Sequence, residues 1–94
     1  MSRSVVKGRR RVTFSVKAAP GAEVWLAGTF NNWQVGERRL VDKSGAGDYT
    51  VSLMLAPGEH QYKFVINGVW TLDPANGDWV ANDVGSLNSV RRVT

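Results

Sequence analysis

After its first ten residues, the chain alternates apolar and polar side chains in short runs that are separated by turn residues. In the run RVTFSVK, Val12, Phe14 and Val16 share one face, because successive side chains of a strand point to opposite sides. The same period recurs at residues 23–29, 48–55 and 59–66. No segment has the period of a helix, so the pattern predicts an all-β chain whose strands each bury one face.

Turn residues separate these runs. Pro-Gly pairs, a Gly-rich run at 43–48 and an Asn-Gly pair punctuate the chain, and two further strands are expected at 38–42 and 88–93. About seven strands with turns every ~8–12 residues favour an antiparallel, immunoglobulin-like β-sandwich. The segment 75–86 is rich in Asn, Asp and Gly and is expected to be a long loop.

Asn67-Gly68 is the strongest local signal, because this pair favours a two-residue type I′ hairpin. Such a turn pairs Ile66 with Val69 and Val65 with Trp70. The alternation places Phe64 and Ile66 in the core, so Trp70, Val65 and Lys63 share the outer face. Lys63 is then diagonal to Trp70 and within reach of it. The sequence therefore predicts a large aromatic ring and a cation together on an outward-facing sheet.

Length and charge limit the possible functions. The 94 residues fit one domain, here a β-sandwich over residues 11–94 preceded by a flexible basic tail over 1–10. Residues 1–11 hold five basic side chains and no acid, whereas the remainder has 7 basic and 8 acidic ones. The basicity belongs to the tail, so we do not expect nucleic acid as a partner.

Cysteine is absent, which excludes disulfides and thiolate metal sites. No apolar run reaches membrane-spanning length and no secretory signal is visible, so we expect no membrane partner and a cytoplasmic location.

No constellation of residues points to catalysis. His60 is the single histidine, stands beside a turn without a nucleophile motif, and is best explained as structural. Asp73, Asp78 and Asp83 recur in a turn-rich segment, but their spacing matches no EF-hand. We therefore expect no enzyme, no metal site and no cofactor.

The four tryptophans are more informative. Trp25 lies opposite the apolar face of its strand, and Trp33 stands in a polar loop beside two asparagines. Trp70 is on the predicted outer face, and Trp79 either plugs the core edge or extends a binding surface. Large apolar side chains in poorly buried contexts usually mark an interaction site.

Four motifs occur together in order: GTFNNW at 28–33, PGEHQYKFVINGVW at 57–70, DP at 73–74 and GSLNSV at 85–90. With these motifs the chain resembles the family-48 carbohydrate-binding modules, and among them the glycogen-binding domain of the AMP-activated protein kinase β subunit. The resemblance covers about residues 11–93, which is nearly the whole chain. It implies an early-set immunoglobulin-like sandwich, in agreement with the strand pattern.

The resemblance also implies site residues. The two sugar-stacking tryptophans of the family fall on Trp33 and Trp70, and the sugar-binding lysine falls on Lys63. A sugar-binding asparagine falls on Asn88. The remaining positions are Val84, where the family has a longer leucine that enters the ring of glucose units, and Ser86, where it has a threonine.

The implied function is non-catalytic binding of α-1,4-linked glucans such as glycogen, starch or maltooligosaccharides. The alternative is a protein–protein interaction module of the same fold, attached to or regulating a glucan-metabolising enzyme or a kinase. Two stacked tryptophans of ~100 Å² each give at most ~5 kcal/mol, and association costs several kcal/mol. We therefore expect single-oligosaccharide dissociation constants on the order of micromolar to millimolar.

Overall fold

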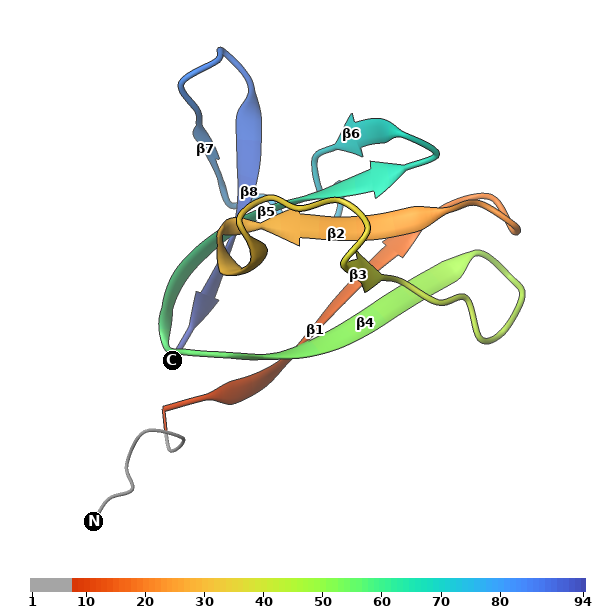
Figure 1. The fold of residues 1–94 in the computed structure, drawn as a ribbon, viewed down its shortest axis with the longest axis horizontal. Coiled ribbons are helices and arrows are strands. Elements are labelled where there is room, and N and C mark those ends of the chain that lie inside the picture. The colour runs from red at the N-terminus through yellow and green to blue at the C-terminus, as the bar shows by residue number, and fades with distance from the viewer. Residues whose placement is uncertain (1–7) are drawn as a thin grey trace.

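The protein, described here by a computed structural model for residues 8–94, is built from two antiparallel β-sheets (Figure 1). The elements are, in chain order, β1 (Arg10–Lys17), β2 (Val24–Gly28), the short 3₁₀ helix η1 (Thr29–Asn31), β3 (Arg38–Arg39), β4 (Asp48–Leu55), β5 (Gly58–Ile66), β6 (Val69–Thr71), β7 (Trp79–Ala81) and β8 (Leu87–Val93). β1 and β4 form one sheet, and the other has the order β3-β2-β5-β8-β7, with β6 also paired to β5. This architecture confirms the predicted all-β sandwich.

β1 begins at Arg10, one residue before the start predicted for the folded domain. The predicted basic tail falls mostly on residues 1–7, which lie outside the described residues, so the tail stays a prediction. Within residues 8–94, no helix is long and apolar enough to cross a membrane.

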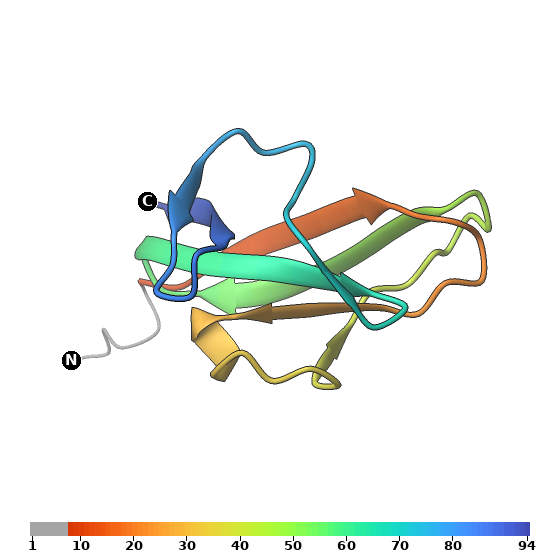
Figure 2. The ribbon, with the colours of Figure 1, turned by 90° about the horizontal axis from the view of Figure 1, so that it is seen from above.

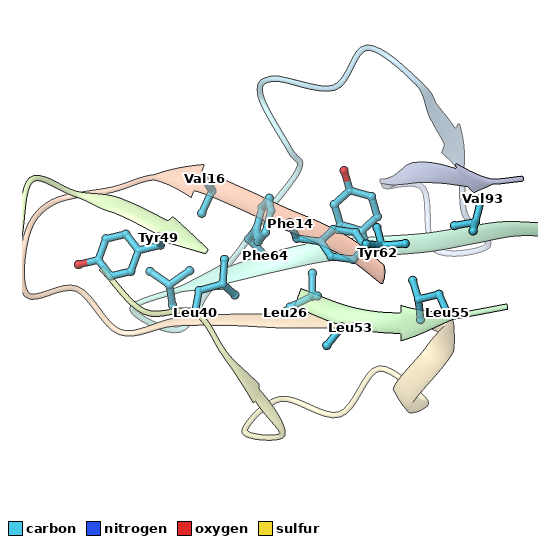
Figure 3. Packing of buried hydrophobic residues seen from close by; sticks show 12 residues of the cluster. Phe14, Val16, Leu26, Leu40, Tyr49, Leu53, Leu55, Tyr62, Phe64 and Val93 are labelled. Atoms are coloured by element: carbon cyan, nitrogen blue, oxygen red, sulfur yellow. The ribbon is translucent and has the colours of Figure 1, made fainter. Parts of the chain in front are cut away.

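The core forms where the inward faces of the two sheets meet (Figure 3). Phe14 of β1 lies edge-on against Tyr62 of β5, with ring centroids 4.8 Å apart and planes at 70°. Tyr62 meets Phe64 in the same manner at 5.8 Å and 77°. Edge-to-face contacts of this kind are a preferred aromatic geometry. All three rings are fully buried, so the period-two pattern of β1 and β5 is what brings the sheets together.

The Asn67-Gly68 turn forms the predicted hairpin. Both residues have positive φ, 49° and 83°, as a type I′ turn requires. Ile66 pairs with Val69 and Val65 with Trp70, which confirms the predicted register for these pairs. The hairpin thus fixes Trp70 of β6 beside Val65 of β5, on the outer face of the sheet.

The structure corrects the sequence analysis in two segments. Residues 79–81 form β7, paired with β8, inside the stretch that we expected to be a loop. Three residues between Asn, Asp and Gly are too short to show a strand period. The polar loop after β2 begins with η1, a single turn that has no periodic signal either.

A buried polar network attaches the connection between β6 and β7, which arches away from the strands in Figure 2, to the core. The Tyr62 hydroxyl donates to Asp73 Oδ2 at 2.6 Å and accepts from Asn76 Nδ2 at 3.1 Å. Asp73 Oδ1 accepts from the Ala75 amide, and the Asp73 amide donates to Ser89 Oγ. Burial and the bond to Asp73 raise the pKa of Tyr62 to about 12.

Replacing Tyr62 with Phe tests this network. The Asp73 carboxylate loses a donor inside the protein, so we expect the free energy of unfolding at pH 7 to fall by about 1–3 kcal/mol. Urea unfolding followed by tryptophan fluorescence measures the change. An unchanged free energy of unfolding would show that the hydroxyl contributes nothing to stability.

The raised pKa of Tyr62 predicts that the stability difference between the wild type and Tyr62→Phe depends on pH. The folded-state pKa of about 12 lies above the ordinary value of 10.0, so the unfolded chain releases this proton first. The stabilisation is complete below pH 10 and is lost as the pH rises to about 12. The difference in unfolding free energy between the wild type and Tyr62→Phe should shrink across this window. A constant difference up to pH 12 would contradict the shift.

Candidate functional site

Trp70 and Trp33 lie against each other on the outer face of the larger sheet. Their ring centroids are 6.5 Å apart and their planes are inclined by 48°. Trp70 is 47% exposed, and Trp33 is half-buried. In Figure 1 the segment that follows η1 passes over β2, and Trp33 is the second residue of this segment. This contact supplies the geometry that the sequence lacked, because no pattern relates a loop residue to a hairpin residue.

The buried side chain of Asn31 shapes the segment that carries Trp33. Its Oδ1 accepts from the Gly28 amide at 3.0 Å, and its Nδ2 donates to the carbonyls of Leu26 and Gln34, both at 3.4 Å. The chain then reverses through Asn32 and Trp33, which both have left-handed backbone angles. Such angles cost energy for residues other than glycine. The bonds of Asn31 offset that cost and hold the turn.

Gly28 allows this segment to approach β5. A Cβ atom at Gly28 would stand 2.5 Å from the Gln61 carbonyl oxygen and 2.7 Å from the Phe30 ring. No side chain fits in that space. The glycine of the GTFNNW motif is therefore required for packing between η1 and β5.

The tryptophan pair forms one wall of a surface groove of about 740 Å³. The hairpin formed by β7 and β8, which projects from the sheet in Figure 1, forms the opposite wall. All six residues predicted from the sequence line this groove: Trp33, Lys63, Trp70, Val84, Ser86 and Asn88. Their common location is a structural result, whereas their role in binding stays a prediction.

Lys63 connects the two walls. Its Nζ donates to Ser86 Oγ at 2.8 Å. An ammonium group has three donors, so two N–H groups remain for a ligand. Val84, next to Ser86 at the hairpin tip, is 86% exposed, which leaves its side chain free to contact anything in the groove.

Asn88 is only 7% exposed, which is less than expected for a ligand-binding side chain at the surface. Its Nδ2 donates to Gln61 Oε1 at 2.9 Å, and its Oδ1 accepts from Asn82 Nδ2 at 3.2 Å. One N–H and one lone pair of its amide remain available. Asn88 is thus held in place by two neighbouring amides.

The sequence analysis missed four residues that line the groove: Gln61, Ala81, Asn82 and Asp83. Gln61 had a usable signal, because the period of two places it on the same face as Lys63. Asn82 and Asp83 stood in the segment expected to be a loop, where no register was available.

Asn82 organises the hairpin tip. Its Oδ1 accepts from the amides of Val84 and Ser86 at 3.1 and 2.9 Å, and its own amide donates to the Ser86 carbonyl. Together with its bond to Asn88, these contacts hold the groove wall in one conformation.

The other two tryptophans lie outside the groove. Trp25 is half-buried and packs against the Arg39 guanidinium, 5.7 Å from the ring centroid. Trp79 is 50% exposed on β7 and pairs with Ser89, which faces the opposite side of the sheet from Asn88. Trp79 therefore does not extend the groove.

Three of the four side chains considered for catalysis have structural partners. His60 Nε2 bonds the Ala56 carbonyl at 2.8 Å. Asp73 is buried in the Tyr62 network, and Asp78 pairs with Arg92. In the part of the chain that the structure describes, no three His, Asp or Glu side chains gather where they could hold a metal ion.

Comparison with known families gives a match over residues 11–94 to the glycogen recognition site of AMP-activated protein kinase. The chain is 38% identical over 73 residues to the β-1 subunit of this kinase from Sus scrofa, covering 78% of the chain and 56% of that sequence. The human β-1 subunit is also 38% identical, and the match covers 25% of its length.

Two further relatives have other names. The chain is 36% identical over 84 residues to the chloroplastic protein FLOURY ENDOSPERM 6 from Oryza sativa, covering 89% of this chain and 15% of that one. Among solved structures, the maltogenic amylase from S. marinus matches with a TM-score of 0.76 at 25% identity, covering 93% of this chain and 14% of the other. The chain thus spans about half of one relative's sequence and a quarter or less of the others'.

Changing Asn31 to Asp tests what positions Trp33. The carboxylate keeps the acceptor for the Gly28 amide but removes both donors and places a charge beside two carbonyls. We expect a loss of about 1–3 kcal/mol in unfolding free energy, measured by urea titration. The exposed neighbour Asn32 is the control, because Asn32→Gly preserves the left-handed conformation and should change stability by less than about 0.5 kcal/mol. Equal losses would contradict the role of Asn31.

Variants of Asn82 test the hairpin tip. Asn82→Ala removes the acceptor for the Val84 and Ser86 amides, so their hydrogen exchange should accelerate at least about tenfold, which corresponds to about 1.4 kcal/mol of lost local protection. Asn82→Asp keeps an acceptor and should retain slow exchange at both amides. Equal exchange rates in the two variants would rule out this side chain as the organiser.

Proposed function

This chain belongs to the family of glycogen recognition sites of AMP-activated protein kinase, and we propose that its groove binds α-1,4-linked glucans such as glycogen, starch and maltooligosaccharides. Members of this carbohydrate-binding family are non-catalytic, and the module described here binds glycans without acting on them. The observation that carries the proposal is the inclined pair of Trp33 and Trp70, with Lys63 beside it.

The inclination of the two rings favours a curved ligand. Glucose rings present C–H groups on their faces, which pack on the face of an indole. An α-1,4 chain coils, so successive sugar faces are turned relative to each other, as the two indoles are by 48°. A β-1,4 chain is an extended ribbon with flat faces, for which coplanar platforms would be needed. The geometry therefore supports selection by the shape of the polymer.

The polar groups of the groove suit sugar hydroxyls. The two free N–H groups of Lys63 can donate to them, while the remaining N–H and lone pair of Asn88 can donate and accept. Each such bond contributes roughly 1 kcal/mol net. Together with at most ~5 kcal/mol from the two indoles, and against the cost of association, this supports weak binding of one oligosaccharide.

Weak binding at one groove suits a module that acts within a larger protein. On a glycogen or starch particle many chains are available, and linkage to a second binding element raises the overall affinity without any new contact. We propose that the whole protein uses this module to bring a glucan-metabolising enzyme or a kinase assembly to its polymer. A cytoplasmic location is part of the same proposal.

Titration with maltoheptaose, followed by tryptophan fluorescence or calorimetry, tests the site. Trp70→Ala and Trp33→Ala should each weaken binding by about tenfold or more, which is about 1.4 kcal/mol or more of lost stacking. Trp79→Ala removes an equally large and exposed indole outside the groove, so it should change the affinity by less than about twofold. Cellohexaose should not bind.

Two results would contradict the proposal. The first is the absence of a saturable response to maltoheptaose in the millimolar range. The second is an equal loss of affinity in Trp79→Ala and in Trp70→Ala, which would show that binding does not take place in the groove.

A further inference from the structure

A second hollow, of about 310 Å³, lies beside Phe30, three residues before Trp33. It shares no lining residue with the glucan groove. We call it the Phe30 hollow. Its floor is made by the side of η1 and by the end of β4, and its rim includes the residue that precedes β1 and the first residue of β3.

The floor of the Phe30 hollow is apolar and mostly rigid. Phe30 packs on the core residue Phe14, with ring centroids 5.8 Å apart. Leu53 and Leu55 are 7% and 5% exposed, so the core holds them, whereas Met54, whose side chain points to the opposite face of β4, is 54% exposed. A methionine at the edge of the hollow can adapt its shape to an apolar side chain.

The rim of the Phe30 hollow carries two cations, the guanidinium groups of Arg9 and Arg38, beside the imidazole of His60, and no acidic residue lines the hollow. Arg9 Nη1 donates to the Met54 carbonyl at 3.3 Å. Arg38 is exposed, and no carboxylate of residues 8–94 lies within salt-bridge distance of it. Arg92, by comparison, pairs with both Glu59 and Asp78.

We propose that the Phe30 hollow is a docking site for a partner protein, and that it receives an apolar side chain with a carboxylate next to it. The apolar floor matches the side chain, and Arg9 and Arg38 match the charge. Charge complementarity of this kind steers encounter and excludes wrong partners. A basic or uncharged segment would leave the two guanidinium groups without an anion.

The energetics favour a protein segment over a free small molecule. Burying one leucine-sized side chain yields less free energy than association costs in lost translational and rotational freedom. A small amphiphilic anion is therefore not retained by this hollow alone. A partner that makes further contacts around the rim overcomes the cost, and the hollow then fixes its position.

The test is a titration of the full chain, followed by amide and methyl NMR shifts. The probe is a blocked peptide of sequence Asp-Glu-Leu-Glu-Asp, and its basic counterpart Lys-Arg-Leu-Arg-Lys is the control. The acidic peptide should cause saturable shifts at Phe30, Leu53, Met54 and His60, with a millimolar dissociation constant. The basic peptide should cause none there.

Charge variants make the test specific. Arg38→Glu should weaken binding of the acidic peptide at least fivefold. Lys43→Glu makes an equal charge change at an exposed site outside the hollow. Once the effect of net charge that both variants share is subtracted, Lys43→Glu should change the dissociation constant by less than about twofold. Arg38→Gln serves if the Glu variant does not fold. Maltoheptaose binding should be unchanged in the Arg38 variants.

Three outcomes would overturn the proposal. They are the absence of saturable shifts at the hollow, equal shifts with the basic peptide, and equal effects of the Arg38 and Lys43 variants. Shifts confined to the groove between Trp33 and Trp70 count as the first of these outcomes.

Discussion

The alternation of side chains along β5 is the constraint on which the rest of the structure depends. Its inward residues, Tyr62 and Phe64, hold the two sheets together through edge-to-face contacts, while its outward residues, Gln61 and Lys63, line the groove. A shift of one residue in the register would turn both sets over. Core and site are therefore specified by the same short pattern, and the Asn-Gly turn that follows it sets the β6 partners of Phe64, Val65 and Ile66.

The groove walls depend on polar side chains that bond mainly to the protein itself. Asn31 holds the turn that presents Trp33, and Asn82 holds the hairpin tip that presents Ser86 and Val84. Both asparagines use the two ends of one amide, accepting from backbone N–H groups and donating elsewhere. Because these bonds form before any ligand arrives, the groove loses little conformational entropy on binding.

The sequence predicted the elements that have their own period and turn chemistry. Residues 59–71 are the best example, because alternation and an Asn-Gly turn together fixed their register and the face of Trp70. It did not predict β7, whose three residues are too few for a period. It could not place Trp33 opposite Trp70, since that contact depends on the hydrogen bonds of Asn31 and on space at Gly28. The resemblance to a known family indicated six residues that line the groove, but it did not indicate Gln61, Asn82 or Asp83.

The groove lies at the surface, between the tryptophan pair and the β7–β8 hairpin, and an open surface site would determine how a long polymer is used. A pocket closed at one end recognises chain termini, whose number does not grow with chain length. A surface groove accepts any interior stretch, so every added glucose unit creates one more binding register on the same molecule. A domain that leaves one register finds the next within the length of a few sugars. On the proposed function, retention on a polymer would thus become a property of the polymer's length, even if each encounter with the groove were brief.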